Sequence, residues 1–125
     1  LIEGAGGWRV PLNEAEDFSD LPRALGLPVI MVVGLKLGCL NHARLTAEAI
    51  AADGLTLAGW VGSVVDPAFA VDSPRFGANV ALLKRALPAP CLGIIPHLAT
   101  ADAPTAQRYL SLDALLPLAT QEATP

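Results

Sequence analysis

The sequence lacks the features that would place the chain in a membrane or on a nucleic acid. Its longest apolar run, residues 25–35, ends at Lys36 and is well short of the ~20 residues that a membrane-spanning helix needs. Eight basic residues stand against twelve acidic ones, a formal net charge of −4, and no basic run could follow a phosphate backbone. We therefore expect neither a membrane nor a nucleic acid among the partners.

Cysteine is scarce, and the first residue is not methionine. The two cysteines, Cys39 and Cys91, form neither a C-x-x-C pair nor a disulfide framework. The first residues do not resemble a signal peptide, so we expect a reducing, cytoplasmic location. The chain opens on an apolar pair and Glu3, as a strand cut partway along would, and we expect a fragment of a longer domain.

Several catalytic motifs are also missing. Nothing matches the phosphate-binding pattern G-x-x-x-x-G-K-[ST], and neither Lys36 nor Lys84 supplies its lysine. No serine occupies a G-x-S-x-G elbow and Cys39 has no evident base, which leaves acyl transfer without support. His42 and His97 have no acids or cysteines clustered near them, so we expect structural or polar-contact roles for them rather than zinc binding.

What the sequence does contain is an alternation of apolar strands and helical segments. Hydrophobic residues make up 53% of the 125 residues, enough for one substantial core. The alternation predicts an α/β fold in a single domain, with a mostly parallel sheet flanked by helices. The expected strands are residues 27–34, 57–67 and 90–96, preceded by a strand that ends at Ile2. Two helices are expected, one from near Cys39 to Gly54 and one from Ser73 to Leu87. A weaker helical pattern covers residues 107–116, before a polar tail.

Ligands of such sheets gather where strands end and helices begin. Four segments qualify, namely residues 3–8, 34–43, 62–67 and 95–102. In the first, Glu3 precedes a run rich in glycine and is either a Mg²⁺ ligand beside a nucleotide or a solvated carboxylate. In the second, a helix starting near Cys39 would turn the backbone amides of residues 38–40 toward an anion, although an ordinary glycine turn has the same sequence.

Four segments are distinctive together in their order and spacing: EGAGGWRVPL, LPVIMVVGLKLGCLNHARLTAEAI, LTLAGWVGSVVDP and PAPCLGIIPHL. On these segments the chain, from residue 1 to residue 98, resembles the C-terminal half of dethiobiotin synthetase, a family of the biotin pathway. The resemblance implies a P-loop NTPase-like fold and a homodimer that uses ATP and Mg²⁺ to close a ring on 7,8-diaminopelargonate with CO₂. In the implied reaction a carbamate is phosphorylated to a carbamic-phosphoric anhydride, which closes to dethiobiotin and releases ADP and phosphate.

The resemblance also implies roles for individual residues. Glu3 matches the family's Mg²⁺ ligand, and residues 37–41 match a segment that reaches across the family's dimer interface to the substrate carboxylate. The implied nucleotide-binding positions are Glu3, Gly4, Ala5, Gly6, Ser63, Val64, Pro96, His97 and Leu98, and the implied substrate-binding positions are Gly6, Leu37, Gly38, Cys39, Leu40 and Asn41.

The family's phosphate-binding loop and the lysine that assists carboxylation belong to its N-terminal half. The resemblance therefore implies that residues 1–125 are the C-terminal portion of one domain, that the catalytic lysine lies outside them, and that they are inactive alone.

Two positions depart from the family's pattern. Ser63 stands where the family commonly has an asparagine that binds the adenine, which predicts relaxed nucleotide choice. By spacing, an acidic contact to the nucleotide would fall at Ala103, with Asp102 beside it. Two other functions stay open: a non-catalytic dimerisation or ligand-binding module, and another ATPase or synthetase of cofactor biosynthesis.

Overall fold

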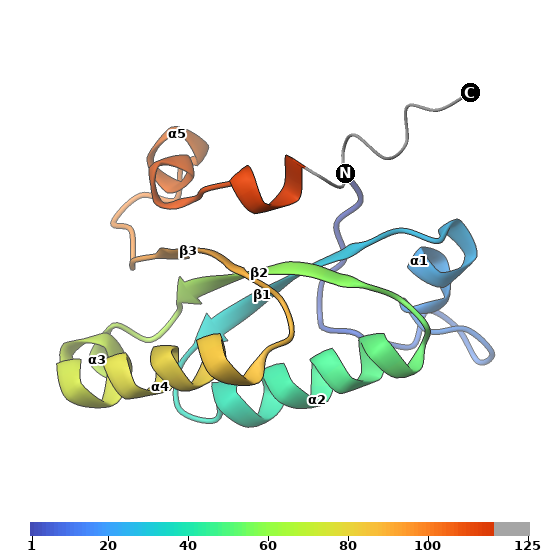
Figure 1. Ribbon diagram of the computed structural model, residues 1–125, viewed down its shortest axis with the longest axis horizontal. Coiled ribbons are helices and arrows are strands. Elements are labelled where there is room, and N and C mark those ends of the chain that lie inside the picture. Colours follow the sequence, from blue (N-terminus) through green and yellow to red (C-terminus); the bar gives the residue numbers. More distant parts are fainter. Residues whose placement is uncertain (117–125) are drawn as a thin grey trace.

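The centre of the molecule is a three-stranded parallel sheet, seen in a computed structural model that describes residues 1–116 (Figure 1). The strands are β1 (Val29–Leu35), β2 (Leu57–Val64) and β3 (Cys91–Ile95), in the order β1-β2-β3. Each strand overlaps its predicted range, and both neighbouring pairs are parallel. The predicted α/β class is confirmed.

Helices lie on both faces of this sheet, and the longer ones share one face (Figure 1). That face is covered by α2 (Cys39–Ala52) and α4 (Ser73–Ala86), with the short α3 (Pro67–Val71) beside α4. The opposite face carries three short elements, α5 (Ala103–Ala106), η1 (Gln107–Tyr109) and η2 (Asp113–Leu115). Of these, η1 contacts β3, η2 contacts β2, and α5 packs against η1. A further short helix, α1 (Asp20–Leu25), precedes β1. Within residues 1–116, no helix combines the length and the apolarity needed to cross a membrane.

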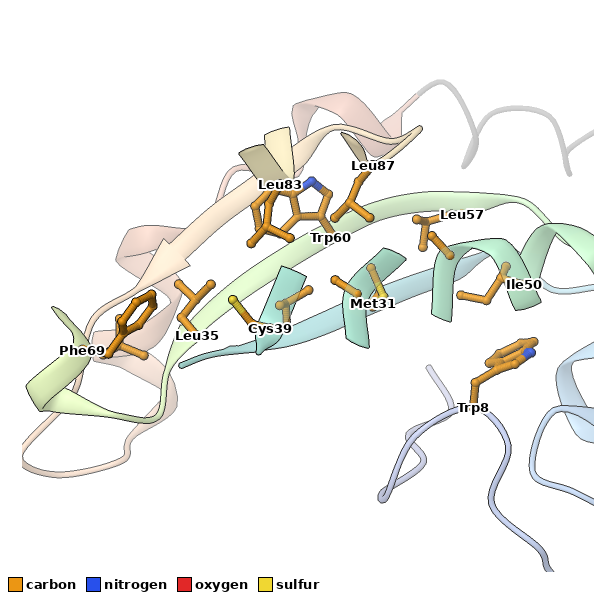
Figure 2. Close-up of a cluster of buried hydrophobic side chains, with 14 residues drawn as sticks. Trp8, Met31, Leu35, Cys39, Ile50, Leu57, Trp60, Phe69, Leu83 and Leu87 are labelled. Atoms are coloured by element: carbon orange, nitrogen blue, oxygen red, sulfur yellow. The ribbon is translucent and has the colours of Figure 1, made fainter. Parts of the chain in front are cut away.

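The main core lies between the sheet and the α2–α4 layer (Figure 2). Side chains of β1 alternate between its two faces, so that Met31, Val33 and Leu35 are buried. Ile30 and Val32 point the other way and are 40% and 68% exposed. The apolar run of β1 predicts cover on both faces, whereas the described residues cover mainly one.

Two predicted elements are wrong, each for a physical reason. Residues 1–4 form no strand: Ile2 is about half exposed, and no described strand pairs with this segment to satisfy its backbone groups. The helix predicted over residues 107–116 is divided instead, because Leu110 adopts an extended conformation and bridges to Gly93. The polar tail beyond residue 116 lies outside the described residues.

The helix ends largely follow their predicted signals. Gly54, with φ of +78°, follows the end of α2 as expected. The predicted cap of α4 is wrong by one residue, because Asp72 rather than Ser73 precedes the helix and accepts a hydrogen bond from the Arg75 N–H at 3.4 Å. Such a carboxylate suits the positive end of a helix.

Candidate functional site

Three of the four predicted segments start side by side at one edge of the sheet. Because the strands are parallel, their carboxyl ends meet there. Ser63 of β2 is in register with Gly34 of β1 on one side and with Ile95 of β3 on the other. The loops after β1, β2 and β3 therefore line the same edge, the position where ligands bind in open α/β sheets.

The loop between β1 and α2 contains the predicted anion-binding turn. Gly38 has φ of +92°, and nothing lies within 4 Å of where its Cβ would be, so the backbone there is open to close approach. The N–H of Cys39 donates to the carbonyl of Lys36 at 3.1 Å, which leaves one fewer amide for a ligand than the sequence predicts. Asn41 is exposed in the first turn of α2.

The side chains around this turn divide between the core and the solvent. Cys39 is 2% exposed and lies beside Leu35 in the core, so its thiol does not face the loop (Figure 2). Leu37 is 63% exposed. The Cys39 side chain is therefore closed to a ligand, and its backbone N–H is already used within the turn.

Ser63 and Val64 lie on opposite faces of β2. Val64 is buried in the core on the side of α2 and α4, so its side chain does not reach the surface. Ser63 faces the other side, by the alternation of the strand, and is partly exposed. Of the two predicted nucleotide contacts in β2, the Ser63 side chain is thus the accessible one.

The segment after β3 leaves the sheet without regular structure. Pro96 and Leu98 are half-buried, and His97 is exposed. The Asp102 carboxylate is occupied locally, since its Oδ1 accepts a hydrogen bond from the Thr105 N–H at 2.8 Å and caps α5. Ala103 opens that helix and offers no acidic group.

The first predicted segment, residues 3–8, does not join the other three. A Cβ on Gly4 would overlap the ring of Phe18, and one on Gly6 would lie 3.2 Å from a methyl of Val10, so the glycines pack against the following turn. Trp8, which ends the segment, lies near Ile50 at the opposite end of the core from Leu35 (Figure 2).

A side-chain cluster that the sequence analysis missed fixes the end of this segment. The indole N–H of Trp8 donates to Oδ2 of Asp53 at 2.7 Å, and Arg9 donates to Oδ1 of the same carboxylate at 2.9 Å. Arg9 also donates to the hydroxyl of the fully buried Ser19 at 3.1 Å. The hydrogen bond from Arg9, and then that from Trp8, hold the pKa of the Asp53 carboxyl below its usual range.

No sequence pattern links these residues, because Trp8 and Asp53 are 45 positions apart. The local sequence features that could have drawn attention to this cluster are the Trp-Arg pair directly after the glycines and the acid directly before Gly54.

Glu3, the predicted metal ligand, belongs to no larger group of metal-binding side chains within residues 1–116. Throughout residues 1–116, no three His, Cys, Asp or Glu side chains gather as a metal site would need. Glu3 is exposed, and within that same part of the chain no side chain pairs with it. Mg²⁺ is commonly held by one or two carboxylates together with phosphates and water, so a single exposed carboxylate fits that ion.

Comparison with known proteins agrees with the α/β fold. A family model described as an AAA domain matches residues 1–105, and the chain belongs to this AAA domain family. Among curated proteins it is 60% identical to the ATP-dependent dethiobiotin synthetase BioD of Chromohalobacter salexigens, over 92% of this chain and 50% of that protein.

Proteins of the same name from Cellvibrio japonicus and Ralstonia nicotianae are 53% and 54% identical, each over 93% of this chain and 49% of the relative. The resemblance to dethiobiotin synthetase is therefore confirmed. The chain spans about half the length of the curated relatives it matches.

Proposed function

We propose that the whole protein to which these residues belong is an ATP-dependent dethiobiotin synthetase. The observation that carries the proposal is the 53–60% identity, over about nine-tenths of this chain, to proteins of that name. The reaction would join CO₂ to 7,8-diaminopelargonate as a carbamate, phosphorylate the carbamate with ATP, and close the ring with release of ADP and phosphate.

Two of the proposed binding regions lie at the sheet edge. At the start of α2, the open turn at Gly38 and the exposed Asn41 suit the carboxylate of the diamine, because a helix N-terminus favours an anion. Across the same edge, Ser63 and the backbone of residues 96–98 are the proposed nucleotide contacts. One hydroxyl satisfies fewer groups of a base than an amide does, which supports relaxed nucleotide choice.

Two further parts of the proposed site concern phosphate and metal. Glu3 is the proposed Mg²⁺ ligand, with Gly4, Ala5 and Gly6 close to the phosphates. This role requires residues 3–6 to reach the sheet edge in the full-length protein, whereas in residues 1–116 Trp8, which follows them, lies at the other end of α2. No G-x-x-x-x-G-K-[ST] pattern occurs in residues 1–125, and the relatives are about twice as long. We assign the phosphate-binding loop and the catalytic lysine to that other half of the protein, and these residues to the C-terminal portion of its domain.

A homodimer with shared sites, working in the cytoplasm, completes the proposal. The outer surface of α2 has a shallow hollow lined by Leu40, Asn41, Arg44, Leu45 and Glu48, which adjoins the proposed carboxylate-binding turn. Leu37 and Leu45 are 63% and 56% exposed there. A hollow lined by both exposed leucines and polar side chains suits a partner subunit that brings its substrate to this turn.

The direct test is to supply the full-length protein with ATP, Mg²⁺, CO₂ and 7,8-diaminopelargonate and to measure dethiobiotin and ADP together. Equal yields of both are expected, and residues 1–125 alone should form neither. A folded full-length protein that binds both ligands without turnover would favour the non-catalytic module instead. ATP hydrolysis without dethiobiotin would favour a different synthetase.

A further inference from the structure

We propose that β1 is the docking strand for the part of the full-length protein outside residues 1–125, here called the remaining half. The free edge of β1 pairs with a parallel strand of the remaining half, and apolar side chains of that half cover the exposed face of β1. The inference rests on the proposed function, because it takes these residues as one portion of a longer domain.

The exposed face of β1 differs from the same face of its neighbour β2. Val32 of β1 is in register with Val61 of β2, so the two side chains point to the same side of the sheet. Val32 is 68% exposed, whereas Val61 is 8% exposed. The short elements on this side contact the other two strands, η2 against β2 and η1 against β3. Parallel sheets are covered on both faces, so Val32 marks the area that the described residues leave open.

The outer edge of β1 is open as well. The sheet order is β1-β2-β3, so among residues 1–116 β1 has a strand neighbour on one side only. The N–H of Val29 donates to the carbonyl of Thr56 at 2.8 Å, on the side of β2. Because successive residues of a strand turn their N–H groups to opposite sides, those of Ile30 and Val32 point to the open edge. Such a row of free groups is a template for another strand.

The other edge of the sheet is not left open in this way. At β3, Gly93 bridges to Leu110, and the N–H of Ser111 donates to the carbonyl of Leu92 at 2.8 Å, so the chain partly closes that edge itself. No described segment does this at β1, whose seven residues include no proline and no charged side chain. Proline and charge are what keep exposed edge strands from pairing, so the edge of β1 fits a strand that is paired in the full-length protein.

The remaining half is the occupant that the length of the relatives supports. This chain covers 49–50% of three of them, so as much chain again is available to continue the sheet. Both existing strand pairs are parallel, which favours a parallel strand at β1. The carboxyl end of that strand would lie beside the loops after β1, β2 and β3, so the remaining half would reach the proposed binding site at this edge.

The first test needs no substitution. In the full-length protein, hydrogen exchange of the Val32 N–H is compared by NMR with that of the Val61 N–H. We expect the two rates to agree within about tenfold, because both groups would be bonded inside the sheet. Exchange of Val32 at the rate of an unstructured amide would overturn the proposal. Protection of Val32 that is lost on dilution while that of Val61 remains would also overturn it, because a second copy of the chain would then be the occupant.

The second test concerns the covered face. Val32→Thr keeps the β-branched shape that suits a strand but places a hydroxyl under the remaining half. The matched control is Val71→Thr, because Val71 ends α3 and is 83% exposed. In the full-length protein we expect Val32→Thr to lower the urea midpoint by about 0.5 M, and Val71→Thr to leave it within about 0.1 M. Equal shifts in the two variants, or no shift in either, would overturn the proposal.

Neither test depends on turnover, so the proposal and the proposed function can fail separately. A full-length protein that makes no dethiobiotin rejects the proposed function. The docking role of β1 is then still decided by the exchange rates and the two urea midpoints.

Discussion

Glu3 is the one residue of this chain that is proposed to bind Mg²⁺. In the full-length protein Glu3→Gln keeps the size of the side chain and removes the charge that would face Mg²⁺. Turnover should fall on the order of 10²-fold, because a metal contact acts on the charge that develops in the transition state. The measurement is steady-state ADP release across a Mg²⁺ titration.

Stability offers a control for that variant. Glu3 is exposed and makes no described hydrogen bond or ion pair within residues 1–116, so the unfolding midpoint of Glu3→Gln should match that of the wild type. A variant with unchanged turnover and unchanged Mg²⁺ dependence would remove Glu3 from the metal site.

Asp53 gives the free energy of unfolding a predictable dependence on pH. Its pKa is lowered in the folded state, so the charged form stabilises the fold at every pH above the unfolded value of about 3.9. That contribution disappears as the pH falls through the lower, folded pKa. Urea unfolding at several pH values should therefore show Asp53→Asn less stable than wild type at pH 7 and nearly equal in strong acid. A difference that does not vary with pH would contradict this.

At the scale of elements, Gly93 joins β3 to the segment that follows it. A Cβ at this position would overlap the carbonyl oxygen of Tyr109, and φ is +153°. Gly93→Ala should therefore cost about 2 kcal/mol or more, because the obstacle is backbone and cannot rotate away. Denaturant unfolding gives the cost, and hydrogen exchange at Ser111, whose N–H donates to the carbonyl of Leu92 at 2.8 Å, gives its location.

The same substitution elsewhere in the chain provides the matched control. Gly77 lies inside α4, and nothing lies within 4 Å of where its Cβ would be. Gly77→Ala should stabilise the protein by about 0.5–1 kcal/mol, since alanine loses less backbone freedom than glycine in a helix. Equal effects at the two positions would show that the contact with Tyr109 has no energetic role.

Elements with long, continuous signals could be predicted from the sequence. β2 is almost wholly buried, so its apolar run marks it clearly, and α2 carries four buried residues at helical spacing. The short α1 and α3 were missed, because six and five residues are too few to establish a period. The division of residues 107–116 depends on the bridge to Gly93, which no local pattern contains.

The candidate site divides in the same way. The loops after β1, β2 and β3 were predictable, because strand direction alone brings them to one edge. Val64 and Cys39 were predicted as ligand contacts because they match a family motif, but a motif does not say which face of a strand or helix a residue occupies. Both side chains lie on the face that packs into the core. The contact of Trp8 and Arg9 with Asp53 depends on tertiary structure, and the sequence gives no means to pair them.

At the scale of the whole molecule, a shared site predicts complementation between two damaged subunits. A Glu3→Gln protomer and an Asn41→Leu protomer, each nearly inactive alone, should regain activity when mixed. Random pairing makes half of the dimers mixed, and one of the two sites in each is intact, so recovery should approach about a quarter of the wild-type rate. Mixed dimers that recover nothing beyond the parent homodimers would refute the cross-subunit arrangement.

The two tryptophans lie in very different surroundings. Trp60 is fully buried beside Leu83 and Leu87, and its Nε1 has no acceptor among residues 1–116, whereas the indole of Trp8 is bonded to a carboxylate at the end of α2 (Figure 2). Each should therefore have its own emission spectrum. Trp60→Phe would leave a fluorescent reporter on the glycine segment, and Trp8→Phe one inside the sheet. The chain thus carries two native optical probes, through which release of the segment can be timed separately from loss of the core.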